Sequence, residues 1–309
     1  MPARSFDYNL LTPLRVLLEE RSVSKAAERM HMSQPALSAA LARLRTHFGD
    51  PLLERRGNVY ELTPLAIQLL ERSYSAARSM ERVFSAQAEF DPATSSREFT
   101  IFSSDYAMAV LGPVVSAVMA ESAPDARLQF YNIDQDVVAG APDTLRDFDG
   151  VIIPHGFISG ASHLDLLVDS WVCLISADNT EVGDELTLDD LRRLPWVFTY
   201  NGQSQYSPGF KQMQQIGIDP HIDVVTPSFL AAPFLLAGTN RITLAHGKFA
   251  AKLAGDPRIR VFACPFEVIP LRESFWWNAV HDRDPEHIWL RSMLTEAAAR
   301  LAASETSTP

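Results

Sequence analysis

A run of polar and small side chains between positions 33 and 45 has the chemistry to contact the edges of DNA bases. Gln34 can make two hydrogen bonds to adenine, and the hydroxyl of Ser38 adapts to either edge of a base pair. Pro35 can touch a thymine methyl group, whereas Arg45 can reach phosphate or guanine. These residues share one arc of a helix that begins after Ser33. The alternative is a small helical bundle whose polar face is only solvated.

Three predicted helices would position this arc. Leucines at helical spacing indicate a first helix over 8–20, and a short second helix over 25–30 follows, with Ser24 as its expected N-cap. Ser33 is the expected N-cap of the third helix and Pro35 suits its first turn. The buried stripe of the third helix comprises Leu37, Leu41, Leu44 and Phe48, and Gly49 ends it. A short helix, a tight turn and a longer helix are typical of a helix-turn-helix unit.

Residues 50–64 predict a β-hairpin, because two extended stretches flank the turn signal Gly57-Asn58. A hairpin that follows a helix-turn-helix is a wing. Arg55 and Arg56 lie at its tip, where they can enter a narrow minor groove. The alternative is an exposed pair of solvated charges.

The charge distribution agrees with a nucleic-acid site confined to the N-terminal region. Residues 1–64 carry nine basic and seven acidic side chains, a net charge of +2. The whole chain has 27 basic and 38 acidic residues, so 18 basic and 31 acidic residues, or −13, remain for the rest of the chain. Only the N-terminal part is therefore expected to approach phosphate.

The segment SVSKAAERMHMSQPALSAALARLRTHFGDPLLERRGNVYELTP resembles the winged helix-turn-helix of LysR-type transcriptional regulators. The resemblance implies a homo-oligomer, a dimer or a tetramer, that binds an imperfect inverted repeat in double-stranded DNA near a promoter and responds to a small-molecule effector. RNA polymerase is a further candidate partner. Base readout by Ser33, Gln34, Pro35 and Ser38, with Arg55 in the wing, is likewise implied by the resemblance. We expect the DNA-binding domain to span 1–62.

A helix is predicted to start at Pro64, after the N-cap Thr63, and to extend to about residue 88. Apolar and small residues alternate along it at steps of four and three, which is a heptad seam. The seam can pack against the same chain or against a second copy, and we favour the second copy because a twofold operator needs a twofold protein. The expected linker and hinge span 63–90, and the dimerisation residues are Leu70, Ala77, Met80 and Phe84.

From Glu98 onward, strands alternate with helices, which predicts an α/β region with a largely parallel, doubly wound sheet. Ligands bind such sheets beyond the carboxyl ends of the strands. The polar residues that directly follow the predicted strands are therefore candidate effector contacts: Ser103, Ser104, Asp105, Asn132, Tyr200 and Asn201.

The resemblance extends through the chain, and the segments LVDSWVCLISAD and PSFLAAPFLLAGTNRI look like the branch that contains nodulation and naphthalene/salicylate-degradation regulators. It implies a periplasmic-binding-protein-like effector domain over 91–309, with subdomain I at about 97–168 and 268–302 and subdomain II at about 169–267. Crossover strands are implied near Trp171–Ser176 and Val261–Glu267. Ser104, Asp105, Ser228, Phe229 and Lys248 fall on the cleft motifs, and Lys248 suits a small organic or aromatic acid. Asn179-Thr180 stands where that branch usually has His-Pro, so the identity of the inducer cannot be inferred from the branch.

Other kinds of chemistry find little support. The segment HDRDPEH suggests a metal site, but Asp284-Pro285-Glu286 is also a good helix start, which we favour. No P-loop, G-x-G-x-x-G or G-x-S-x-G motif occurs, so we expect neither an enzyme nor a cofactor. Cys173 and Cys264 lie in apolar runs and are expected to be buried. With so few cysteines and no apolar signal core or membrane-length segment, a cytoplasmic protein is expected. The remaining alternative is a solute-binding protein whose helical N-terminal part serves only assembly.

Overall fold

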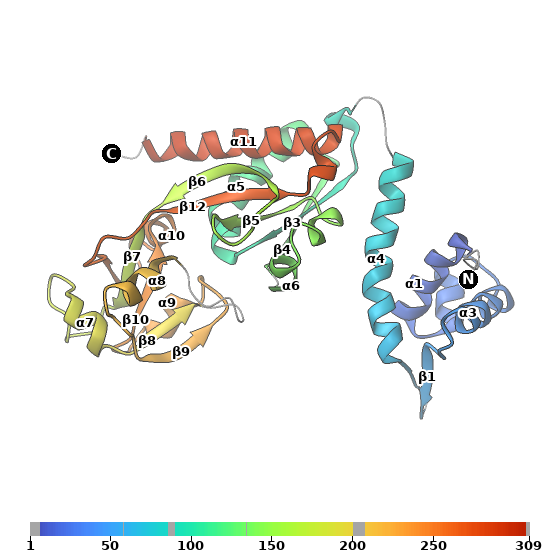
Figure 1. The fold of residues 1–309 in the computed structure, drawn as a ribbon, viewed down its shortest axis with the longest axis horizontal. Helices are drawn as coiled ribbons and strands as arrows, with labels where there is room; N and C mark the ends of the chain where they lie inside the picture. The colour runs from blue at the N-terminus through green and yellow to red at the C-terminus, as the bar shows by residue number, and fades with distance from the viewer. Residues whose placement is uncertain (1–6, 58, 86–89, 134, 200–207, 307–309) are drawn as a thin grey trace. The chain divides into compact units, whose positions relative to one another are not determined.

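The computed structural model describes residues 7–57, 59–85, 90–133, 135–199 and 208–306. The chain divides into two compact units, Met1–Gln87 and Ala88–Pro309. No helix among the described residues is long and apolar enough to cross a membrane. Figure 1 shows the first unit as a small helical bundle with a hairpin and a long helix, and the second as two sheets with helices around them.

The first unit begins with the predicted helix-turn-helix. Its helices are η1 (Tyr8–Leu10), α1 (Leu11–Glu20), α2 (Val23–Arg29) and α3 (Gln34–Phe48). Their leucines form one buried core with two alanines of α2, Ala26 and Ala27. The N-cap of α2 is Ser22 and not Ser24, because the hydroxyl of Ser22 accepts from the amide of Lys25 and the partly buried Val23 starts the helix. Gly49 ends α3 in the left-handed conformation, as predicted.

The expected hairpin is formed by β1 (Leu53–Arg56) and β2 (Val59–Leu62), which pair antiparallel. Helix α4 follows over Pro64–Ser85 and packs on α1. Residues 86–89, which the predicted helix would include in part, lie outside the described residues.

The described residues of the second unit form two five-stranded sheets. The first has the order β4-β3-β5-β12-β6, and the second has the order β11-β7-β10-β8-β9. We call them, with their helices, subdomain I and subdomain II. The strands are β3 (Glu98–Ser103), β4 (Arg127–Asn132), β5 (Gly150–Pro154), β6 (Ser162–Asp169), β7 (Trp171–Ser176), β8 (Trp196–Thr199), β9 (Ile222–Thr226), β10 (Ile242–His246), β11 (Ile259–Ala263) and β12 (Leu271–Trp277).

Both sheets are mixed and not largely parallel. In subdomain I, β3 is parallel to β4 and β5, whereas β12 is antiparallel to β5 and β6. Subdomain II has the same plan, with β8 parallel to β9 and β10, and β7 antiparallel to β10 and β11. The antiparallel pairs arise because the chain passes from one sheet to the other and returns. The passage occurs at Ser170 and the return through 264–270, so Trp171–Ser176 is itself a strand of the second sheet.

Helices cover the faces of both sheets. Helices α5 and α11 pack together beside the first sheet (Figure 1). The other face of this sheet carries a smaller apolar cluster around Phe102, Val151 and Trp276. The main apolar core continues from subdomain I into subdomain II, where it includes Trp171, Cys173 and other residues of the second sheet. The helices and 3-10 segments of this unit are η2 (Pro92–Thr94), α5 (Asp105–Ser122), α6 (Gln135–Ala139), η3 (Thr144–Arg146), α7 (Leu188–Arg193), α8 (Pro208–Gln215), α9 (Ala232–Leu236), α10 (Gly247–Lys252), η4 (Ala279–His281) and α11 (Pro285–Thr306).

Candidate functional site

The first turn of α3 presents its predicted polar arc to solvent. Gln34, Pro35 and Ser38 are exposed, whereas Leu37 and the other leucines of the same helix are buried. The hydroxyl of Ser33 accepts from the amide of Ala36 at 3.4 Å, so this residue is the N-cap of α3. The arrangement leaves the amide of Gln34, the hydroxyl of Ser38 and the ring of Pro35 available to a partner.

Arg45 does not belong to this exposed arc. Its Nε donates to the carbonyl oxygen of Pro51 at 2.8 Å, and a terminal nitrogen donates to the carbonyl of Leu53 at 3.4 Å. The guanidinium thus ties the end of α3 to the start of the hairpin. Arg45 follows Leu41 by four residues and therefore lies beside the buried stripe of α3, where the hairpin folds back within reach of its side chain. The predicted contact of Arg45 with DNA therefore competes with a structural role.

The same junction is fixed by Asp50. Its carboxylate accepts from the amide of Leu52 at 2.6 Å and from the hydroxyl of Thr63 at 2.7 Å. Leu52 is fully buried and has a φ of 60°, a left-handed conformation that a leucine adopts only when its surroundings enforce it. The hairpin is therefore held rigidly relative to α3.

The tip of the hairpin carries two exposed cations. Arg55 donates to the carbonyl of Gly57 at 3.1 Å, and Arg56 lies 3.2 Å from the carboxylate of Glu61. Both side chains are held loosely by exposed groups, so both can exchange these contacts for phosphate oxygens.

The predicted seam of α4 has two different environments. Ala66 and Ser73 are buried, and Leu70 packs against the core of the helix-turn-helix, so this part of the seam is covered by its own chain. Ala77 is half-buried and the side chain of Met80 is 38% exposed. The side chain of Phe84 lies outside the described residues. Ile67 and Val83, which the heptad pattern did not include, are 50% and 71% exposed and add apolar surface.

In the second unit, the polar residues after β3 connect the two subdomains. Ser104 is the N-cap of α5, since its hydroxyl accepts from the amide of Ala107 at 3.2 Å. The carboxylate of Asp105 accepts from the hydroxyl of Ser228 at 2.6 Å and from the amides of Phe229 and Leu230, both at 3.1 Å. Three predicted site residues thus come together, although the carboxylate of Asp105 is already occupied by subdomain II.

A second carboxylate, which the sequence analysis did not identify, makes a similar connection. Asp169 ends β6 and accepts from the phenol of Tyr106 on α5 at 2.5 Å. It also accepts from the backbone amide of Lys248, which lies 3.1 Å from each carboxylate oxygen. Burial raises the pKa of Asp169, although these hydrogen bonds oppose the increase. A Cβ at Gly247 would lie 2.4 Å from Oγ of Ser170 and 3.1 Å from Oδ1 of Asp169, so a larger residue here would require these side chains to shift.

Buried polar atoms gather near these connections without a hydrogen-bond partner in the described structure: Nε1 of Trp171, Oγ1 of Thr199, Nδ1 of His246 and Oε2 of Glu273. The ring of His246 lies 3.9 Å from that of Tyr106 and 4.5 Å from that of Trp171, measured between centroids. Complete burial lowers the pKa of His246 to about 3, and burial together with the charge of Asp169 raises the pKa of Glu273 to about 8. Both groups are therefore neutral at pH 7.

A pocket adjoins these atoms on subdomain II. The space between its side chains is about 270 Å³, a figure that includes open solvent, and the enclosed part is much smaller than a usual ligand site. The walls are mostly aromatic or aliphatic, and Thr199 ends β8 at the edge where ligands of α/β sheets bind. The lining residues are Trp171, Trp196, Val197, Phe198, Thr199, Phe210, Phe229, Thr243 and Leu244.

The other predicted cleft residues have different positions. Ser103 is buried and donates to the carbonyl of Ser104 at 3.2 Å, whereas Asn132 is exposed at the end of β4 beside Ser103. Tyr200 and Asn201 lie outside the described residues. Asn179, at the position of the missing histidine, is buried in a turn and donates to the carbonyl of Asn240 at 3.3 Å.

The structure also shows the local conformation of the segment HDRDPEH. Asp284 accepts from the amides of Glu286 and His287, so the predicted helix start is confirmed. His287 is buried and bonds the carbonyl of Asp149 at 2.7 Å, and burial lowers its pKa to about 4. Cys173 is buried in β7, as expected, whereas Cys264 is only partly buried, and the two sulfurs lie 3.9 Å apart. A hydrogen bond to Cys264, together with burial, raises the pKa of the Cys173 thiol well above its ordinary value.

A winged helix-turn-helix joined by a helix to a two-subdomain α/β unit with a pocket defines a class of ligand-controlled DNA-binding regulators. The model of the bacterial regulatory helix-turn-helix proteins of the lysR family matches residues 8–67, and that of the LysR substrate binding domain matches 93–299. The chain therefore belongs to the LysR family of transcriptional regulators, which control transcription in response to an effector and are not enzymes.

Nodulation proteins are among its relatives. Nodulation protein D 2 of Sinorhizobium fredii (strain NBRC 101917 / NGR234) is 32% identical over 99% of this chain and 98% of its own length. Nodulation protein D 1 of Rhizobium meliloti (strain 1021) is 31% identical over 97% of this chain and 98% of its own. The predicted resemblance to nodulation regulators is thus confirmed.

Solved structures share the fold. The probable transcriptional regulator PA0477 from Pseudomonas aeruginosa has a TM-score of 0.75 and 24% identity, and covers 95% of this chain and 97% of its own. Full-length CbnR complexed with its target DNA has a TM-score of 0.67 and 18% identity, and the match covers 96% of this chain and 100% of the CbnR chain.

Proposed function

We propose that α3 reads base edges in the major groove of double-stranded DNA through Gln34, Pro35 and Ser38, while Arg55 and Arg56 contact the adjacent backbone or minor groove. The exposure of this arc on a helix whose opposite side is buried carries the proposal. The rigid junction at Asp50 supports it, because a wing held at a fixed angle to α3 can span neighbouring grooves. The solved complex of CbnR with target DNA is a precedent within the same fold.

The form that we propose to bind DNA is a homo-oligomer, either a dimer or a tetramer. It would bind an imperfect inverted repeat in the cytoplasm. Support comes from the exposed apolar side chains of α4, which include Ile67, Met80 and Val83. Apolar side chains on one helix gain stability when a second copy covers them. RNA polymerase, a partner implied by the family resemblance, would contact the assembly at the promoter.

The proposed effector is a small aromatic acid bound in the pocket of subdomain II. The aromatic walls favour a flat ring, and the side chains must move apart to admit it, because little enclosed space lies between them. An indole N–H can only donate, so the buried Nε1 of Trp171 requires an acceptor such as a carboxylate oxygen. The hydroxyl of Thr199 offers a second donor. Phe229 connects the pocket to Asp105, so a ligand here can bias the contact between the subdomains.

DNA binding is tested by gel shift, with the full chain and the DNA upstream of its own gene. Specific retardation should weaken steeply as salt increases, because phosphate contacts release counterions. Equal retardation of every fragment, or of none, would contradict the proposed base readout and favour a helical region used only for assembly.

Effector binding is tested separately by thermal shift with benzoate and 2-hydroxybenzoate, and with hexanoate as a non-aromatic acid. An aromatic acid should raise the melting temperature of the wild type and not of Trp171→Phe, which keeps an aromatic ring but removes the indole N–H. Leu188→Ala, at an exposed position of α7 outside the pocket, is the control and should respond like the wild type. An equal shift with hexanoate would exclude an aromatic site.

A further inference from the structure

A group of two histidines and a carboxylate lies across strands β5, β12 and β6 of the sheet of subdomain I, away from the pocket. His155 directly follows β5, and His163 and Asp165 lie two residues apart on β6, so they share one face of that strand. One potential ligand atom from each residue lies within 4.8 Å of the other two. All three residues are exposed.

Residues of β12, the strand between β5 and β6, hold this group in place. The ring of Trp276 lies 4.6 Å from that of His163 and 5.1 Å from that of His155, measured between centroids. The hydroxyl of Ser274 donates to Oδ1 of Asp165 at 2.7 Å. Because Trp276 is buried and paired within the sheet, both imidazoles rest on a rigid support.

The contacts within the group show what a bound ion would replace. Nε2 of His155 lies 2.7 Å from Oδ1 of Asp165, and Arg272 donates to Oδ2 of the same carboxylate at 3.0 Å. Arg272 and Ser274 orient the carboxylate from outside, as outer partners of metal ligands do. A metal ion that binds Oδ1 and the two imidazoles takes the place of the hydrogen bond between His155 and Asp165.

We propose that His155, His163 and Asp165 bind one divalent transition-metal ion of the Zn²⁺ class. Zinc bonds of about 2.0–2.1 Å in a tetrahedron place ligand atoms about 3.4 Å apart, so modest side-chain rotations close the present spacing. Two imidazoles favour Zn²⁺, Ni²⁺ or Cu²⁺ over Mg²⁺ and Ca²⁺, which prefer oxygen ligands. Three protein ligands leave a fourth position for water.

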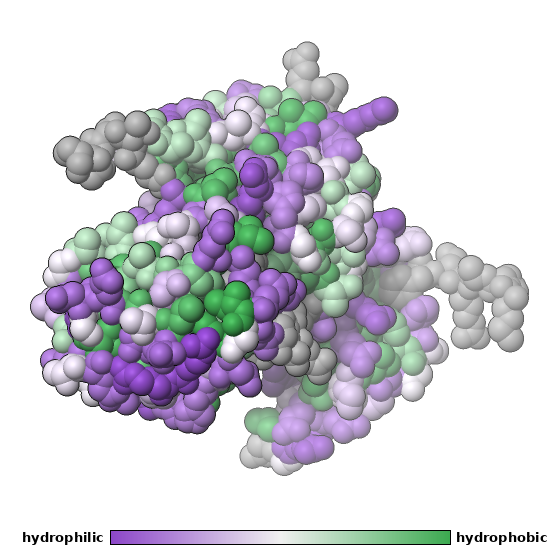
Figure 2. Space-filling model, turned by 60° about the vertical axis from the view of Figure 1, so that its left-hand side comes forward, coloured by the Kyte–Doolittle hydropathy of each residue, from purple (hydrophilic) through white to green (hydrophobic). Residues whose placement is uncertain are grey.

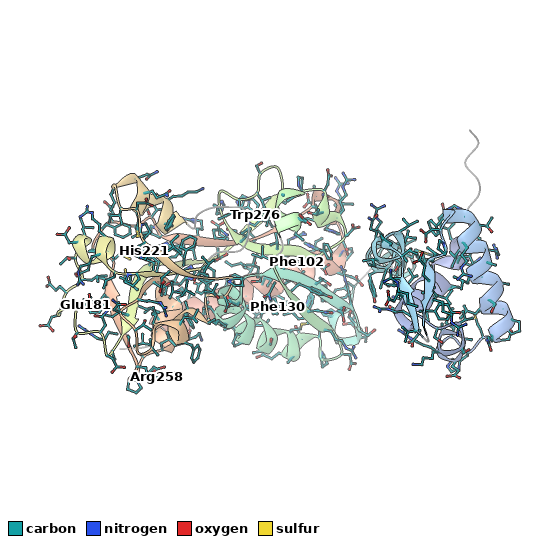
Figure 3. All side chains as sticks on the ribbon, turned by 90° about the horizontal axis from the view of Figure 1, so that it is seen from below. Phe102, Phe130, Glu181, His221, Arg258 and Trp276 are labelled. Carbon is teal, nitrogen blue, oxygen red and sulfur yellow. The ribbon has the colours of Figure 1, made fainter. Side chains whose placement is uncertain are left out.

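The first test is a titration of ZnCl₂ into the tag-free full chain in competition with a chromogenic chelator. The wild type should bind one more Zn²⁺ per chain than His163→Ala, His155→Ala and Asp165→Asn, or bind it at least about 10-fold more tightly. His221→Ala removes an exposed histidine of subdomain II and is the matched control; Figure 3 labels His221 and Trp276 in the two different subdomains. Cys264→Ser controls for binding by the two neighbouring thiols.

A second measurement does not depend on replacing a ligand. Cu²⁺ should quench the tryptophan fluorescence of the wild type, and Trp276→Phe should lose most of this quenching while it still binds the ion. Equal stoichiometry and affinity in the wild type and the three ligand variants would overturn the proposal, as would a loss confined to Cys264→Ser. Only variants that melt at the same temperature as the wild type are compared, so that a loss of binding is not caused by misfolding.

Discussion

Asp105 on α5 of subdomain I accepts a 2.6 Å hydrogen bond from the hydroxyl of Ser228 in subdomain II. Two further amides of subdomain II donate to the same carboxylate, and Asp169 makes a parallel set of contacts from the end of β6. Two carboxylates thus fasten the subdomains, and Tyr106, which donates to Asp169, also stacks on His246 of subdomain II. A change in their relative angle must break or exchange these bonds.

Replacing Asp105 by alanine is expected to destabilise the effector domain by about 1–3 kcal/mol, because three partly buried donors lose their acceptor together. The first unit should melt as in the wild type. Urea unfolding followed by circular dichroism measures the change. Asp189→Ala removes a carboxylate whose side chain is 90% exposed and should change stability by less than about 0.5 kcal/mol. Equal stability of Asp105→Ala and the wild type would show that the contact does not fasten the subdomains.

Arg45→Met should destabilise the first unit, since it removes the two hydrogen bonds that tie α3 to the hairpin. The expected loss is about 1–3 kcal/mol, measured by thermal melting without DNA. Arg55→Ala, at the exposed hairpin tip, should leave the melting temperature unchanged and weaken binding to all DNA fragments alike. If Arg45→Met melts normally but loses sequence preference, Arg45 is a base-reading residue after all.

Gln34→Ala is expected to weaken binding to the operator by about 1–3 kcal/mol, or about 5- to 150-fold, and to relax the preference for one sequence. The reason is that an exposed amide on the first turn of α3 can make two hydrogen bonds to one base. Gel-shift titrations against the operator and a scrambled fragment measure both effects. Gln215→Ala, at an exposed position of α8, should bind both fragments like the wild type.

The stability of the effector domain should fall as pH rises from about 4.5 to about 8, owing to Glu273, and this decline should level off at higher pH. The pKa of this buried carboxyl is raised to about 8 from an ordinary value of 4.5, so the folded state keeps a proton that the unfolded state releases. Its favourable contribution is complete below pH 4.5 and is lost as pH increases through 8.

Glu273→Gln keeps the shape of the neutral acid and should remove this decline, so the variant should be more stable than the wild type at pH 9 and similar at pH 4. Chemical unfolding over this pH range provides the measurement. His246, whose pKa is lowered to about 3, acts in the opposite direction below pH 6.5 and affects both proteins equally. Parallel stability curves for the two proteins would contradict a neutral Glu273.

The first unit was largely predictable because its signals are local. The cap Ser33, the stop Gly49 and the turn at Gly57 each act within a few residues, and the structure places helices and hairpin accordingly. The N-cap at Ser22 was missed because Ser22 and Ser24 carry the same chemistry, and packing of Val23 decides between them. The seam of α4 could not be assigned to one partner from sequence, since Ala66 and Met80 fit the same pattern yet have different neighbours.

The second unit was predictable in its elements and less so in its site. The strand before Ser103 and the helix that follows appear as expected, whereas β6 and β12 were not recognised and make the first sheet mixed. Asp105 and Ser228 were both identified as site residues. Their hydrogen bond to each other was not predicted, because they lie 123 residues apart in the sequence. Glu273 was missed because a buried glutamate in the sequence LRESFWW has the pattern of an exposed one.

Figure 2 shows hydrophilic residues over most of the face that comes forward, with separate hydrophobic patches between them, so the visible surface offers no single broad apolar area.

The connection at Ser170 has a consequence for the order of the two subdomains along the chain. Asp169 and Leu271 are register partners in adjacent strands β6 and β12, so everything between them is a continuous insertion into one hairpin. A chain that lacked 170–270 and closed the gap with a two-residue turn would therefore still contain all five strands of the first sheet in their present order.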